Sequence, residues 1–250
     1  MQYQYRTSSQ IKEDIAGSKV AILPVGAVEA HGPHLPLGTD NVLAERLAGR
    51  LAEQVDALVL PILPYGQVWS LRHFPGSITI RNQSLIDIVV DIGKSLYTQG
   101  IELFVIVNGH LGNGTALKEA ARELYDACPE LKVVYLFYPG MQKAAKKVRE
   151  TPALHDAYFH ACELETSFML YLAPEYVNMA QAICDMPDIP VSADATPTPW
   201  EEFTSTAVLG DATAAKEEKG EFIINISLKN MVRIIRDVQE LVPKDKNRSF

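Results

Sequence analysis

Residues 20–40 read VAILPVGAVEAHGPHLPLGTD, an apolar run followed by a loop that carries acids and histidines. Residues 20–25 are almost all apolar, which is typical of a strand covered on both faces of a sheet. Glycines and prolines in residues 26–38 interrupt regular hydrogen bonding and therefore predict a loop. Residues 41–54 then show apolar positions at helical spacing. This stretch therefore predicts a strand, a loop and a helix in that order.

The same alternation continues along the chain. Apolar runs at residues 57–63, 103–107 and 131–137 predict further strands, and a short alternating segment at 77–80 predicts another. Helices are expected at residues 11–16, 83–99, 115–125, 141–149, 159–172 and 225–241, with a long irregular connection at 173–206. Strands that alternate with helices predict an α/β fold with a mainly parallel sheet and helices on both sides. We expect residues 1–250 to form a single domain.

Composition limits the class of function. A net charge of -8 argues against a nucleic-acid surface, which needs clustered lysine and arginine. Cys128, Cys162 and Cys184 are widely spaced and odd in number, so we expect neither a disulfide framework nor a Cys-x-x-Cys metal site. Apolar runs are too short for a membrane helix, and the first residues do not resemble a signal peptide. We expect a cytoplasmic protein that acts on a small molecule.

The loop after the first strand holds candidate metal ligands. Glu29 and His31 are two residues apart, so in an extended backbone their side chains leave on the same side. Asp40 precedes a helix, where it can cap the helix or face a cation. Carboxylates and imidazoles at such a position are ligands for zinc, manganese or iron. The alternative is a polar loop whose Asp40 only caps the helix and whose histidines bond locally.

Two other segments carry chemistry of the same kind. His110 follows the apolar strand at 103–107 in the glycine-rich turn Asn-Gly-His-Leu-Gly-Asn. It lies at the carboxyl end of a strand, where ligands of parallel sheets collect. Residues 160–167 read HACELETS. If they are helical, His160 and Glu163 are three apart and share a face, as in helical metal sites.

Five stretches together resemble the creatininase (creatinine amidohydrolase) family. They are VEAHGPHLPLGTD at 28–40, HFPGSITI at 73–80, NGHLGN at 108–113, HACELETS at 160–167 and, more weakly, VLGDATAAKEEKG at 208–220. The resemblance implies a three-layer α/β/α sandwich, two divalent metal ions (zinc, manganese or both, with iron as an alternative) and a homo-oligomer, hexamers being known in the family.

The resemblance also implies a role for each residue. It makes Glu29, Asp40 and His110 ligands of one ion, and His31 and the bridging Asp40 ligands of a second. Creatininase has a glutamate two residues after the histidine of its Asn-Gly-His turn, where this chain has glycine. On the resemblance, Glu163 takes that place as ligand and active-site carboxylate.

Other residues of these segments have less specific roles. His160 matches the family's catalytic histidine, and Glu165 is interpreted as structural or as orienting a ligating histidine. We expect His34 to be a packed loop histidine. His73, Trp69 and Tyr65 are further candidates to line a pocket.

The implied reaction is hydrolysis by a metal-activated water, with a cyclic amide or another non-peptide C–N bond as substrate. Creatinine itself is not favoured, because creatininase has a tryptophan-aspartate pair before its catalytic histidine where this chain has Asp156-Ala157. One alternative is the opening of a keto-sugar or inosose ring. Another is a metal-dependent binder without turnover, although a spare acid–base histidine favours catalysis.

Overall fold

The computed structural model describes residues 1–155 and 159–241 of the 250-residue chain. Its main sheet has four parallel strands in the order β2-β1-β3-β4, namely β1 (Val20–Val25), β2 (Leu58–Val59), β3 (Leu103–Asn108) and β4 (Lys132–Leu136). Every residue of β1 and β3 is buried, as the continuous apolar runs predict for central strands.

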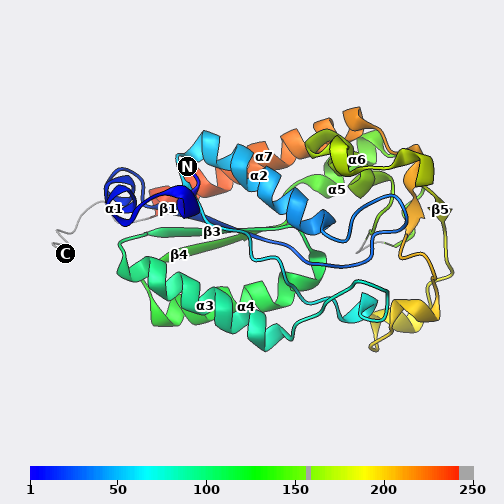
Figure 1. Cartoon of the computed structure of the whole chain (residues 1–250), viewed down its shortest axis with the longest axis horizontal. Helices are drawn as coiled ribbons and strands as arrows, with labels where there is room; N and C mark the ends of the chain where they lie inside the picture. The colour runs from blue at the N-terminus through cyan, green and yellow to red at the C-terminus, as the bar shows by residue number, and fades with distance from the viewer. Residues whose placement is uncertain (156–158, 242–250) are drawn as a thin grey trace.

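Helices cover both faces of this sheet (Figure 1). On one face lie α2 (Thr39–Val55), α5 (Met141–Val148), α6 (Glu163–Leu172) and α7 (Glu217–Glu240), and on the other lie α3 (Asn82–Thr98) and α4 (Gly114–Ala127). The helix α1 (Ser8–Gly17) adds Ile11 and Ile15 to the second side. The expected three-layer α/β/α architecture is confirmed.

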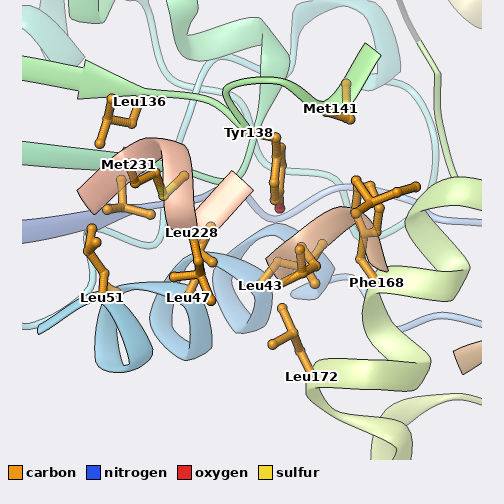
Figure 2. Close-up of a cluster of buried hydrophobic side chains, with 14 of the residues drawn as sticks. Leu43, Leu47, Leu51, Leu136, Tyr138, Met141, Phe168, Leu172, Leu228 and Met231 are labelled. Atoms are coloured by element: carbon orange, nitrogen blue, oxygen red, sulfur yellow. The ribbon is translucent and has the colours of Figure 1, made fainter. Parts of the chain in front are cut away.

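Alternation along the strands divides the core between the two faces. In β3, Leu103, Val105 and Val107 pack with α2, α6 and α7, whereas Phe104 and Ile106 pack with α3 and α4. Figure 2 shows the first of these cores, where side chains from α2, α5, α6, α7, the end of β4 and the segment after it meet: Leu43, Leu47, Leu51, Leu136, Tyr138, Met141, Phe168, Leu172, Leu228 and Met231.

Some local expectations were wrong. Residues 77–80 make only isolated bridges, from Ile78 to Val28 and from Thr79 to Gly66, instead of a strand. The helix expected from residue 159 begins at Glu163, because Ala161 has a left-handed backbone with φ of 47°. The closing helix begins at Glu217 rather than 225.

Short elements connect the main helices and strands. The strand β5 (Cys184–Asp185) pairs antiparallel with β6 (Gly210–Asp211). Short 3-10 helices occur at Tyr3–Tyr5, Trp69–Leu71, Leu111–Asn113, Pro174–Tyr176, Met179–Gln181, Val191–Asp194, Trp200–Glu202 and Ala212–Ala214. Within the described ranges no helix is long and apolar enough to cross a membrane.

Candidate metal centre

The sheet brings the two histidine-bearing loops together. Val25, the last residue of β1, pairs with Asn108, the last residue of β3, so both loops leave the same edge of the sheet. Glu29 and His31 lie on the first loop, Asp40 lies in the first turn of α2, and His110 follows β3.

Gly109 allows the close approach of these segments. A Cβ on Gly109 would lie 2.2 Å from the backbone oxygen of Asp40, a distance that side-chain carbons do not tolerate. The turn before His110 can therefore rest directly on the start of α2 only because residue 109 lacks a side chain.

Asp40 stands between two histidines. His110 Nδ1 lies 3.1 Å from Asp40 Oδ2 and 3.2 Å from Glu29 Oε1. On the other side of Asp40, His31 Nε2 lies 3.5 Å from Oδ1. The same His31 atom lies 3.6 Å from Glu165 Oε2, and His31 and the three acids are all buried.

Backbone carbonyls fix the tautomer of each histidine. A carbonyl oxygen can only accept, so His31 Nδ1–H donates to Glu29 O at 3.1 Å and His110 Nε2–H donates to Gln67 O at 2.7 Å. This leaves the second ring nitrogens, His31 Nε2 and His110 Nδ1, facing the carboxylates. Metal-ligating histidines are held in the same way.

At this cluster, burial and the charges of neighbouring groups shift the pKa of His31 in opposite directions. Burial lowers the pKa of His31, but Asp40, Glu165 and Glu29 together raise it more strongly, to about 10. Burial raises the pKa of Glu165 to about 7, with His31 acting against it and Asp40 adding to it. Three buried acids lie close together here, and a positive charge beside them is required to keep all three ionised.

The residues fit divalent metal ions. Glu29, Asp40 and His110 offer one set of ligand atoms, His31, Asp40 and Glu165 offer another, and Glu29, His31 and His160 offer a third, with all atoms of a set within 4.8 Å of one another. His31 Nε2 and Asp40 Oδ2 are buried and make no hydrogen bond within the described part of the chain. Mixed carboxylate and imidazole donors suit zinc, manganese and iron.

The expectation that Glu163 belongs to this cluster is wrong. Its carboxylate accepts hydrogen bonds from Lys219 Nζ at 2.5 Å and from the N–H groups of Glu150 and Thr151 at 2.8 and 2.9 Å. Glu165 occupies the expected place instead. The helical spacing argument failed because residues 160–162 precede α6, so His160 and Glu163 do not share a helical face.

His160 lies against the cluster. Its Nε2–H donates to Ala30 O at 2.7 Å, and its Nδ1 lies 3.6 Å from Glu29 Oε1 and 4.0 Å from Glu165 Oε2. Burial and then the neighbouring His31 lower the pKa of His160 to about 4, so the imidazole is neutral at pH 7.

A cavity of about 290 Å³ opens over the cluster. Glu29, Asp40, His110, His160 and Glu165 line its floor, and aromatic residues line its walls: Trp69, Phe137, Phe159 and Trp200. Sequence reasoning found Trp69 but missed Trp200, which lies in the long connection with no motif around it.

The lesser candidates lie elsewhere. His34 is buried, as expected, with Nε2 2.8 Å from Thr166 Oγ1. His73 pairs with Glu201 and is largely exposed, and Tyr65 does not line the cavity. Asp156 and Ala157 lie outside the described residues.

Several curated proteins align with most of this sequence. A creatinine amidohydrolase from Pseudomonas putida is 32% identical over 238 residues, which is 89% of this chain and 90% of that protein. A mycofactocin precursor peptide peptidase from Mycolicibacterium smegmatis is 31% identical, covering 82% and 79%. A 3-dehydro-scyllo-inosose hydrolase from Thermotoga maritima is 25% identical, covering 98% and 85%.

Solved creatininase structures superimpose on most of this chain. A mutant creatininase of the Zn-Zn type superimposes with a TM-score of 0.83 at 30% identity, covering 94% of this chain and 97% of that one. An Mn form of creatininase gives a TM-score of 0.82 at 28% identity with the same coverage. The creatininase family model, described as creatinine amidohydrolase, matches residues 4–235. The chain therefore belongs to the creatininase family, whose curated relatives are hydrolases.

Proposed function

We propose that this protein is a divalent-metal hydrolase that cleaves a cyclic amide or another non-peptide C–N bond of a small molecule. The observation that carries the proposal is the pair of ligand sets that share Asp40, with the neutral histidine His160, which belongs to neither of these two sets, beside them. A closed structural metal site has no need of such a histidine.

The proposed ligands divide around Asp40. Glu29, Asp40 and His110 would hold one ion, and His31, Asp40 and Glu165 the other. When bound, such ions lower the pKa of water from ~15.7 towards ~7 and polarise a substrate carbonyl. Glu165 thus replaces Glu163 in the role expected from the sequence.

His160 is the proposed acid–base residue. Its Nε2–H is committed to the carbonyl of Ala30, so only Nδ1, on the side of Glu29, can take up a proton. Because its pKa lies below neutrality, the ring is free to accept that proton at pH 7. His160 would then deliver the proton to the departing nitrogen.

The cavity supports a small substrate over a peptide. Its volume is about 290 Å³, and five residues of the long connection line it together with the metal-cluster residues: Ala193, Thr196, Pro197, Thr198 and Trp200. No lysine or arginine of the described residues lines it, so the bound ions would be the main positive charges that a substrate meets.

The test is a metal count followed by a substrate screen. Protein loaded with Zn²⁺ or Mn²⁺ would be assayed on creatinine, on other cyclic amides, on 3-dehydro-scyllo-inosose and on a short peptide. We expect hydrolysis of a cyclic amide, lost in His160→Ala with metal content intact and retained in Glu45→Ala, a control at an exposed position of α2 outside the cavity. Hydrolysis of the peptide or inosose alone would refute the substrate class, and a protein that binds no metal would refute the mechanism.

A further inference from the structure

A buried lysine lies outside the metal cluster. Lys219, in the first turn of α7, is 5% exposed. Its Nζ donates to Glu163 Oε1 at 2.5 Å and to Ala214 O at 2.7 Å, and lies 3.2 Å from Glu150 Oε1. A buried ammonium is costly unless it is paired, and of the two acids beside Lys219 only Glu163 is itself buried.

Donors surround the carboxylate of Glu163. Besides Lys219 they are the N–H groups of Glu150 and Thr151 and the hydroxyl of Thr151, which donates to Oε2 at 2.5 Å. Both oxygens are therefore occupied on the side of α6 that faces α7. This fully satisfied carboxylate has no reason to turn towards the metal cluster.

The rotation of α6 decides which of its glutamates reaches the cluster. Residues of an α-helix follow one another by ~100°, so Glu163 and Glu165 project about 200° apart around the axis. With Glu163 held on α7, Glu165 points the opposite way. There it accepts the N–H of Ala161 at 2.6 Å and lies 3.6 Å from His31 Nε2.

The two helices are close enough for α7 to hold α6 in place. A Cβ on Gly220, the neighbour of Lys219, would lie 1.9 Å from the carbonyl oxygen of Ser167 on α6. The N–H of Lys216 donates to Ser167 Oγ at 3.0 Å, and that hydroxyl donates to Glu163 O at 2.5 Å. The first turn of α7 thus contacts α6 through backbone as well as side chains.

We propose that Lys219 is a positioning residue for the metal centre: by holding Glu163 it sets the rotation of α6 that turns Glu165 towards His31 and Asp40. This inference rests on the metal part of the proposed function. It predicts that removal of Lys219 weakens metal binding although its Nζ pairs outside both ligand sets.

Lys219→Met is compared with Lys216→Met. Lys216 lies one turn earlier, is largely exposed, and pairs with Glu150 at 2.6 Å, so its variant loses the same charge without touching Glu163. Zn²⁺ affinity is measured by chelator competition, and Co²⁺ serves as a spectroscopic probe of ligand geometry. We expect a roughly 10–100-fold loss of affinity for the ion that His31, Asp40 and Glu165 would hold, and an altered Co²⁺ spectrum, in Lys219→Met, because residues that orient ligands have effects of this size. Lys216→Met should match the parent protein.

Other outcomes overturn the inference. They are a folded Lys219→Met with the parent's affinity and spectrum, or an equal loss in both lysine variants, which would show a charge effect. If circular dichroism shows that Lys219→Met does not fold, Thr151→Val decides the question, since it removes only the hydroxyl donor to Glu163 Oε2. We expect a several-fold loss of Zn²⁺ affinity there, and an unchanged affinity refutes the inference. A parent protein that binds neither Zn²⁺ nor Co²⁺ refutes the proposed function itself, and the inference with it.

Discussion

The indole of Trp200 meets the imidazole of His160 edge to face, with ring centroids 5.2 Å apart and planes inclined by 82°. Trp200 packs against the small cluster that contains Val68 and Leu71, and the adjacent Glu201 pairs with His73. The long connection is thereby fixed to the segment around Trp69–Leu71. Trp200 is consequently a fixed wall of the cavity, directly beside the proposed acid–base residue.

We therefore predict that Trp200→Ala weakens substrate binding. Loss of an aromatic contact costs about 0.5–1.5 kcal/mol, so kcat/KM should fall by up to about 10-fold, mainly through KM. Trp200→Phe retains a ring and should lose less. Steady-state kinetics on the substrate found in the screen measure both variants. Metal content should stay unchanged. A Trp200→Ala protein with the parental KM would contradict a contact between Trp200 and the substrate.

Asp40 is predicted to be required for both ions, because both ligand sets contain it. Asp40→Asn should lose most bound metal, whereas Glu165→Gln should keep the ion held by Glu29, Asp40 and His110 and lose the other. Elemental analysis after dialysis gives the stoichiometry. Glu45→Gln, an exposed position on the same helix, is the matched control. Equal retention of metal by Asp40→Asn and Glu45→Gln would contradict the bridging role.

The sheet and most of the cluster follow from local sequence. Glu29, His31, Asp40 and His110 lie directly after central strands or at the start of a helix, so the parallel sheet alone brings them to one edge. The positions of these side chains can be predicted without knowledge of contacts between distant parts of the chain. This is why their convergence could be predicted.

Glu163 and Glu165 could not be assigned in the same way. The spacing of residues along the sequence does not decide which of the two glutamates faces the metal cluster. We infer that Lys219, which is 56 residues from Glu163 in the chain, decides it. The left-handed turn at Ala161, which delays the start of α6, also carries no sequence signal, since alanine rarely adopts it. Trp200 was missed for a similar reason, because its place beside His160 depends on how a long connection folds back.

Metal removal is expected to destabilise the protein. An ion present at 100 times its Kd adds about 2.7 kcal/mol to the stability of the folded state. For a chain of this size 1 kcal/mol corresponds to about 2–4 °C in Tm, so EDTA should lower Tm by roughly 5–10 °C per ion. Differential scanning calorimetry measures the shift. Zn²⁺ or Mn²⁺ should restore the Tm and Mg²⁺ should not, because Mg²⁺ disfavours imidazole ligands. An unchanged Tm in EDTA would argue against resident ions.

Two glycines on helices are predicted to respond in opposite ways to alanine. A methyl group added at Gly49 on α2 would meet no atom within 4 Å, so Gly49→Ala should stabilise the fold by about 0.5–1 kcal/mol through lower entropy of the unfolded chain.

At Gly220 the added carbon would lie 1.9 Å from Ser167 O and 2.5 Å from its carbonyl carbon, both of which are backbone atoms. The helices α6 and α7 must then separate, and overpacking of this kind costs about 1–3 kcal/mol. Urea unfolding of the metal-free proteins measures both variants and keeps metal binding out of the comparison. A Gly220→Ala protein as stable as Gly49→Ala would show that α7 does not press on α6, and the basis for positioning by Lys219 would be lost.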